Sequence, residues 1–249
     1  MTAQGGMGDG LWVDGLDLSG DIGSLGNIAC PMGVQDTTPI NVLAHKRIGL
    51  EHDGLIDFTA FWNPSAGADQ AHDALSTLPT ADRAVTYCRG TSLGSHAASM
   101  VGKQIGYDGN RAQDGSLLLT VNAVANGYGL EWGQLVSSGK QTDTAAGNGS
   151  TYDTGVVSTA FGWAMYLQVF AFTGTSVTVK VQDSANGTVW ADLSGATFVA
   201  ASAVGSQRVS AGPTSTATVR RYLRVVSSGT FSEAVYGVNF VRYEAGGHQ

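Results

Sequence analysis

Asp-Gly and Asn-Gly pairs recur along this chain, and they separate short segments in which every second residue is apolar. Leu117, Leu119 and Val121 follow this period of two. Alternation of this kind is typical of a strand with one buried face, and an Asp-Gly or Asn-Gly pair favours a tight hairpin turn. Val177, Val179 and Val181 repeat the pattern in the second half of the chain. The sequence therefore predicts a mainly all-β fold of sandwich type.

One segment has helical spacing instead. Residues 68–78 place Ala71, Ala74, Leu75 and Leu78 on one stripe, and Pro79 follows the segment. Apolar residues three and four positions apart form one face of an amphipathic helix, and a proline stops it. We expect one helix packed on the sandwich of the first half.

A polar stretch rich in Gly, Ser and Thr divides the chain. Residues 139–155 read GKQTDTAAGNGSTYDTG, a composition typical of a linker. After it, the sequence carries strand and turn patterns only. We predict a first domain over residues 1–150 and a second, smaller β-sandwich over residues 156–249.

Charge is sparse and acidic. Charged residues make up 13% of the chain and the net charge is −7, whereas about 25% charged residues are usual in soluble domains. A surface with so few charges favours contact with neighbouring molecules, and the acidic balance argues against a nucleic-acid-binding surface. No apolar run reaches the ~18 residues of a membrane-spanning helix, and the first residues lack the pattern of a secretory signal.

Two segments look unsupported. The opening residues Leu11-Trp12-Val13 reverse at Asp14-Gly15 into a second short strand, and an isolated two-stranded ribbon is only marginally stable in water. Residues 91–114 are long for a hairpin loop and rich in apolar residues. The hairpin must therefore be stabilised by the rest of the domain or by another copy of the chain. We expect residues 91–114 to form an arm that extends beyond the core and is bound rather than disordered, because of its apolar content.

Catalytic patterns are weak. Gly90-Thr91-Ser92-Leu93-Gly94 matches G-x-S-x-G, but His96 is too close to Ser92 in sequence to complete a triad, and His248 follows no alternating βαβ pattern. Carboxylate pairs for glycoside hydrolysis remain open, because such pairing is spatial. We expect no enzymatic activity and no cofactor.

Metal and disulfide patterns are equally weak. His45, His52 and His72 do not have the spacing of a zinc site, and no EF-hand loop is present. Cys30 and Cys88 are the only cysteines, and we expect them to be reduced thiols, although one buried bridge remains an alternative.

Ordered motifs resemble a known family. VDGLDLSGDI, VQDTTPINVLAHKRIGLEHDGLIDFTAFWNP, VGKQIGYDGNRAQDGSLLLTV and NGYGLEWG together resemble the major tail proteins (tail tube proteins) of long, non-contractile-tailed phages that infect actinobacteria. The resemblance implies a structural virion protein that forms hexameric rings. These rings would stack into a tube through which genomic DNA passes without sequence-specific binding.

The resemblance also implies partners and contacts. The partners would be copies of the chain and other tail proteins, such as the tape measure and terminator proteins, with assembly in the host cytoplasm. The inter-subunit contact candidates lie in the opening hairpin and in residues 91–114. They are Leu11, Trp12, Val13, Leu16, Leu18, Ala98, Met100, Val101, Lys103, Gln104, Ile105 and Tyr107.

The second half resembles the galactose-binding-like sandwiches attached to phage virion proteins. Trp190, Tyr222 and Arg224 are candidates for a sugar platform, because aromatic faces stack on pyranose rings; packing within the sheet is the favoured alternative. An alternative function is therefore a capsid decoration or carbohydrate-binding virion protein.

Overall fold

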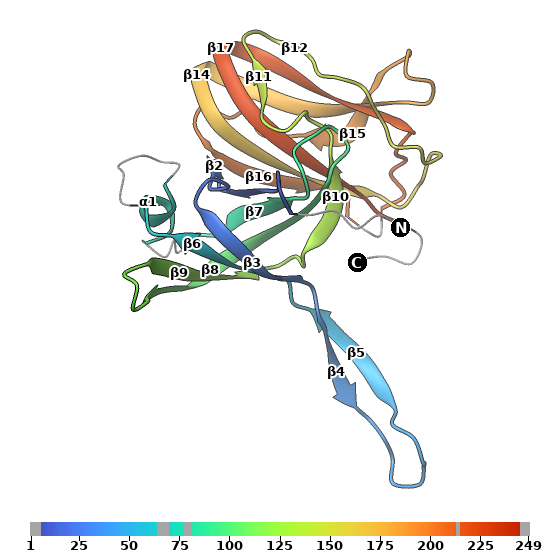
Figure 1. The fold of residues 1–249 in the computed structure, drawn as a ribbon. Helices are drawn as coiled ribbons and strands as arrows, with labels where there is room; N and C mark the ends of the chain where they lie inside the picture. The colour runs from blue at the N-terminus through green and yellow to red at the C-terminus, as the bar shows by residue number, and fades with distance from the viewer. Residues whose placement is uncertain (1–5, 64–69, 77–80, 213–214, 245–249) are drawn as a thin grey trace.

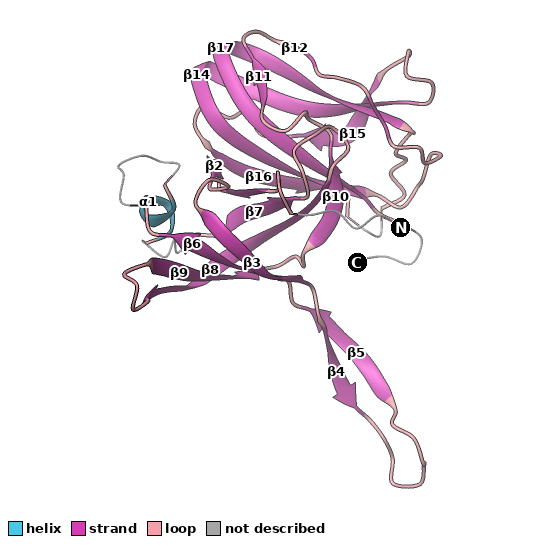
Figure 2. Ribbon diagram, viewed as in Figure 1, coloured by secondary structure: helices cyan, strands magenta, loops and turns pink. Residues whose placement is uncertain are grey.

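The computed structural model describes residues 6–63, 70–76, 81–212 and 215–244. It is almost entirely β-structure, with one large antiparallel sheet, a separate two-stranded ribbon and one short helix (Figures 1 and 2). The predicted all-β class is confirmed.

The first half is a curved sheet around its own apolar core. Its strands follow the order β2-β1-β7-β8-β9-β6-β3. They are β1 (Gly10–Val13), β2 (Leu16–Asp17), β3 (Ile22–Ala29), β6 (Leu55–Phe61), β7 (Arg83–Cys88), β8 (His96–Arg111) and β9 (Leu117–Ala125). Ile56, Phe58 and Ala60 face the core and alternate with Asp57 and Thr59 on the outer side, as a half-buried strand requires.

Helix α1 (Ala71–Leu75) covers part of this core. Ala71 and Leu75 are fully buried, and Ala74 packs against the same cluster, so three of the four predicted stripe residues face the core. Of the predicted segment 68–78, residues 68, 69, 77 and 78 lie outside the described residues, and they include Leu78.

The second half is organised by two very long strands, β14 (Trp163–Ser184) and β17 (Tyr222–Arg242), which pair along their whole length. The register shifts around Ala171 and Gly174, and such bulges bend a strand. At Gly174, φ is 156° and an added Cβ would lie 2.5 Å from the Cα of Phe231, so no larger residue fits there.

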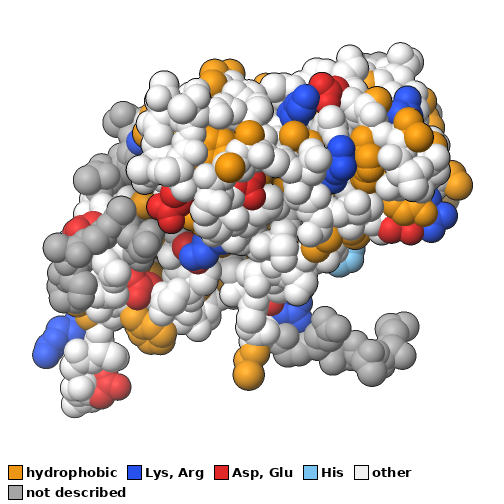
Figure 3. Space-filling view, turned by 90° about the horizontal axis from the view of Figure 1, so that it is seen from above, with side chains coloured by type: hydrophobic (Ala, Val, Ile, Leu, Met, Phe, Trp, Pro, Cys, Tyr) orange, Lys and Arg blue, Asp and Glu red, His pale blue; other side chains and the backbone are white. Residues whose placement is uncertain are grey.

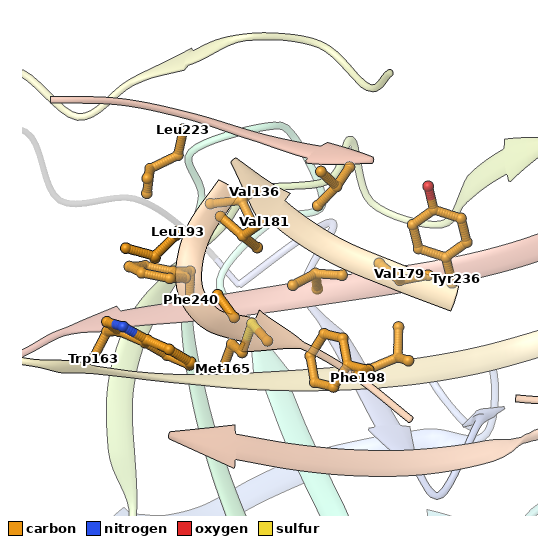
Figure 4. Packing of buried hydrophobic residues seen from close by; sticks show 14 of the residues in the cluster. Val136, Trp163, Met165, Val179, Val181, Leu193, Phe198, Leu223, Tyr236 and Phe240 are labelled. Carbon is orange, nitrogen blue, oxygen red and sulfur yellow. The ribbon is translucent and has the colours of Figure 1, made fainter. Parts of the chain in front are cut away.

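The bend brings the two ends of the same strand pair to one core. Met165 before the bend and Val179 and Val181 after it pack into one cluster with Phe198 and Leu223 (Figure 4). Two further strands of this half, β15 (Ala191–Thr197) and β16 (Gly205–Ser210), both pair with β14.

The polar stretch 139–155 is not a free linker. It forms three short strands that all pair with β17 and so extend the sheet of the second half. They are β11 (Gln141–Asp143), β12 (Gly147–Asn148) and β13 (Tyr152–Asp153). The domain limits at 150 and 156 stay a prediction, as do the family likenesses of the second sandwich.

The two halves are joined by β10 (Glu131–Leu135), which pairs with β8 on one side and with β17 on the other. Gly133 makes this possible, because an added Cβ would lie 2.4 Å from the carbonyl oxygen of Phe240. The core of the first half ends at Leu130 and that of the second begins at Val136.

Candidate assembly surface

A two-stranded ribbon projects from the first half, well away from both cores (Figure 1). It consists of β4 (Met32–Asp36) and β5 (Arg47–His52), which pair only with each other within the described part of the chain. All residues of both strands are exposed. We call residues 31–53 the arm.

Apolar side chains cover the arm. Ile40 and Leu43, in the loop that joins its strands, are fully exposed. The strands add four further exposed aliphatic side chains, namely Met32, Val34, Ile48 and Leu50. The strand register places Met32 and Val34 on one face of the ribbon and Ile48 and Leu50 on the other. Single exposed apolar residues are ordinary on protein surfaces, but several on both faces of one projecting element indicate an interaction site.

Polar groups fix the shape of the loop. Asp36 accepts hydrogen bonds from the backbone N–H of Thr38 at 2.8 Å and pairs with Nδ1 of His45 at 2.9 Å. The Thr38 hydroxyl accepts a bond from the N–H of Lys46 at 2.9 Å. Hydrogen bonds from Thr38, and then from His45, lower the pKa of Asp36, so its carboxylate form is favoured. Hydrogen bonds among the residues on either side of the apolar loop 39–44 therefore hold its two ends together.

The arm was expected elsewhere, and that expectation is wrong. Residues 91–114 contain β8, which pairs with β7, β9 and β10 inside the sheet. Ala98 and Met100 are completely buried, because β8 crosses the middle of the sheet. Of the contact candidates in this segment, Lys103 and Ile105 are exposed, while Val101, Gln104 and Tyr107 are half-buried.

The opening hairpin is supported by the rest of its own chain, which is one of the two alternatives that the sequence left open. Leu11, Trp12, Val13 and Leu18 are buried, and Leu16 is half-buried. Strand β1 pairs with β7, and the Trp12 ring meets Phe170 of β14 edge to face, with 5.1 Å between ring centroids. The hairpin is a structural part of the subunit, and contacts of these residues with other subunits stay a prediction.

A buried charge cluster connects the halves. Arg208 of β16 donates to Glu131 of β10 at 2.9 Å, and the hydroxyls of Tyr166 and Tyr243 donate to the same carboxylate. Burial, and then the Glu131 charge, raise the pKa of both tyrosines, which keeps them protonated donors. The Tyr128 ring covers the guanidinium at 3.7 Å. The sequence offered no signal for this cluster, since its members lie up to 112 residues apart.

The suggested sugar platform is largely engaged within the chain. The guanidinium of Arg224 lies over the Trp190 ring at 4.4 Å and also donates to Gln182 at 2.6 Å. The Tyr222 ring packs beside the turn at Gly187, where an added Cβ would lie 3.5 Å from it. One face of Trp190 is thus covered, and sugar binding there stays a prediction.

The weak chemical patterns do not form sites in the described residues. Ser92 is exposed in the turn between β7 and β8, with a strand rather than a helix after it. No group of three or more His, Cys, Asp or Glu that could hold a metal is found in the described segments. Cys30 and Cys88 are free thiols, and burial raises the pKa of Cys88 well above its usual value.

The outer surface of the second half matches the sparse charge of the sequence. On the face seen in Figure 3, hydrophobic side chains form scattered patches, and charged side chains lie singly or in small groups. In the part of the chain that the structure describes, no helix is long and apolar enough to cross a membrane.

Comparisons with known proteins find only distant likenesses. No family model and no curated protein matches the chain. Among solved structures, the Dit protein of phage SPP1, described as a paradigm of the hub adsorption apparatus in phages that infect Gram-positive bacteria, is 11% identical, with a TM-score of 0.34 over 94% of this chain and 99% of that one.

The baseplate of phage p2 in its activated conformation gives similar values. The form with Sr is 9% identical, with a TM-score of 0.35 over 94% of this chain and 98% of that one. The form with Ca is also 9% identical, with a TM-score of 0.35 over 95% and 99%. These are phage adsorption and baseplate proteins, and likenesses this distant carry no argument about the function of this chain.

Proposed function

We propose that this chain is a structural phage tail protein whose copies close into rings and stack into the tail tube. The rings would be hexameric, as the sequence resemblance implies. Assembly would take place in the host cytoplasm, with tape measure and terminator proteins as further partners. The subunit would have no enzymatic role, and genomic DNA would pass through the tube without sequence-specific contacts.

The observation that carries this proposal is the arm. An isolated two-stranded ribbon is marginal in water, and three or more strands or a packed partner are needed to stabilise it. The arm has no such partner among the described residues, yet its loop is held by defined hydrogen bonds. Burial of Ile40 and Leu43 against a neighbour would contribute about 1.5–3 kcal/mol each, which is a driving force for assembly.

A free sheet edge supports ring closure. Strand β3 pairs with β6 on one side and with no described strand on the other. Unpaired strand edges are templates for another chain, and a head-to-tail contact whose rotation closes produces a ring. The arm and the β3 edge are different surfaces, so each subunit has two distinct places at which to meet neighbours.

The outer face of the sheet β3-β6-β9 suits a channel for DNA. Asp57 accepts hydrogen bonds from Asn122 at 2.9 Å and from Asn27 at 3.2 Å, and Ser24 and Thr59 bond to each other. A polar surface with a fixed carboxylate repels phosphate groups instead of binding them. We infer that this face lines the tube.

The test is assembly of the purified full chain, observed by negative-stain electron microscopy and analytical ultracentrifugation. Ile40→Ser combined with Leu43→Ser should leave a folded protein that sediments as a single subunit, whereas wild-type protein forms tubes. Val189→Ser with Val199→Ser is the matched control, because these valines are also largely exposed but lie on the second half.

Three outcomes would contradict the proposal in different ways. Closed rings that never stack would indicate a ring-forming subunit outside the tube. Isolated wild-type subunits would favour the decoration or carbohydrate-binding alternative. Normal tubes from the arm variant would show that the arm does not hold them together.

A further inference from the structure

A cavity of about 440 Å³ opens between α1 and the inner face of the first sheet. Its walls are mainly apolar and include a few polar groups. The apolar walls come from Val13, Leu16, Phe58, Leu75, Val85 and Val121. Asp14, Asp73, Arg83 and Gln104 contribute the polar groups.

The chemistry of these walls selects the occupant. Protein interiors are packed about as densely as organic crystals, and cavities lined by aliphatic and aromatic side chains bind apolar groups in preference to water. A short apolar segment with polar or charged flanks would fit this site best.

The loop of the arm has that composition. Ile40 and Leu43 are fully exposed, and Lys46 and Arg47 lie three and four residues after Leu43. Neither cation forms an ion pair in the described structure, and the same holds for Asp73, which is exposed at the cavity mouth. The apolar tip of the loop is therefore complementary to the apolar cavity. The two unpaired cations are likewise complementary to the unpaired carboxylate of Asp73.

The loop and the cavity of one chain lie apart in this structure. In Figure 1 the arm extends from one side of the first half, whereas α1 lies on the opposite side. The occupant must then come from another molecule. A contact between two different surfaces of identical chains is head-to-tail, so that each bound copy presents its own arm to the next.

We propose that the cavity beneath α1 is the receptor for the arm loop of a second copy of this chain. The apolar tip around Ile40 and Leu43 enters the cavity, and Lys46 and Arg47 lie near Asp73 at its mouth. This inference rests on the proposed function, since it names the partner surface of the arm within the tail assembly.

Disulfide trapping tests the placement directly. The full chain with Leu43→Cys and Ala74→Cys is assembled and oxidised, then separated on a non-reducing gel. Ala74 lines the cavity from α1 and is half-buried, so its substitution is compatible with the fold. We expect a ladder of dimers, trimers and longer species. Each single variant, which still contains Cys30 and Cys88, should give at most dimers.

Charge reversal gives a second, independent readout. Asp73→Arg should reduce the assembled fraction at least tenfold, and Arg47→Glu in the same chain should restore most of it. Glu233→Arg is the matched control, because Glu233 is exposed on the second half, away from the cavity.

The outcomes separate this inference from the proposed function. If wild-type protein forms tubes but the double cysteine variant gives no disulfide ladder and Arg47→Glu does not rescue Asp73→Arg, the cavity is not the receptor of the arm. The tube proposal would then still stand. Wild-type protein that never assembles would overturn both. A ladder with charge rescue would support both.

Discussion

The backbone N–H of Gly15 donates a hydrogen bond of 2.5 Å to Oε1 of Gln168, which joins the opening hairpin to the long strand β14. The same glutamine donates to the carbonyl oxygen of Ala84 at 2.9 Å, so one buried side chain connects the β1–β2 turn, β7 and β14. Ser206 of β16 extends the connection by donating to Asp14 at 2.7 Å. The first turn of the chain is therefore a contact between its two halves.

Gly15→Ala should destabilise the protein by about 3 kcal/mol. Gly15 has φ of +82°, and an added Cβ would lie 2.3 Å from the carbonyl oxygen of Val169. The left-handed backbone costs ~1–2 kcal/mol for an L-residue, and overpacking adds about 1–3 kcal/mol. Urea unfolding followed by tryptophan fluorescence measures the change.

Gly127→Ala is the control for this prediction. Gly127 also has φ of +82°, but an added Cβ would meet no atom within 4 Å. Its loss should be limited to the backbone cost of about 1–2 kcal/mol. Equal losses at both positions would show that the contact with β14 does not restrict residue 15.

Alkaline pH should destabilise the protein through Tyr87. Burial, and then a 2.6 Å hydrogen bond from its hydroxyl to Asp9, raise the pKa of Tyr87 to about 12. A pKa raised on folding stabilises the protein below the unfolded pKa near 10, and this stabilisation is lost as pH rises through the folded pKa. The stability difference between wild type and Tyr87→Phe should therefore shrink between pH 10 and 12. A difference that stays constant over this range would contradict the assignment.

Local patterns predicted the strands well, because alternation reports directly which face of a strand is buried. The Asp14-Gly15 pair predicted a tight turn with both residues at positive φ, and the structure has φ of 49° and 82° there. Val177, Val179 and Val181 are buried as their spacing indicated. These features depend only on neighbouring residues, which the sequence shows.

The position of the arm could not be predicted in the same way. The segment 31–53 and the segment 91–114 both contain apolar residues in strand-like runs, and alternation does not say which strand a segment pairs with. The small residues Ala97 and Ala98 allow β8 to lie between two neighbours, whereas Met32 and Val34 have no described layer to pack against. The two segments thus differ in which strands they pair with in the folded chain, and the local sequence pattern does not reveal that pairing.

Trp190→Ala should lower the free energy of unfolding by about 1–2 kcal/mol, and we expect no saturable glycan binding that depends on Trp190. The Arg224 guanidinium lies 4.4 Å from the Trp190 ring, and a partly desolvated cation–π contact contributes about that much. Thermal unfolding measures the first effect, and a glycan array with wild-type protein measures the second. Saturable glycan binding that disappears in a folded Trp190→Ala protein would instead support the sugar platform.

Glu131→Gln should be among the most destabilising single changes in this chain. The substitution leaves Arg208 without a carboxylate in a site where both side chains are more than nine-tenths buried. Removing one partner of a buried ion pair typically costs about 3–5 kcal/mol, because the other charge stays desolvated.

Asp153→Asn is the control. It breaks the exposed pair with Arg221 and should leave the urea midpoint nearly unchanged, since solvent screens that pair. Because Glu131 lies on the strand shared by both halves, its loss should also separate their unfolding into two transitions, which tryptophan fluorescence and far-ultraviolet circular dichroism can resolve. A single transition with an unchanged midpoint would show that the backbone pairing of β10 alone holds the halves together.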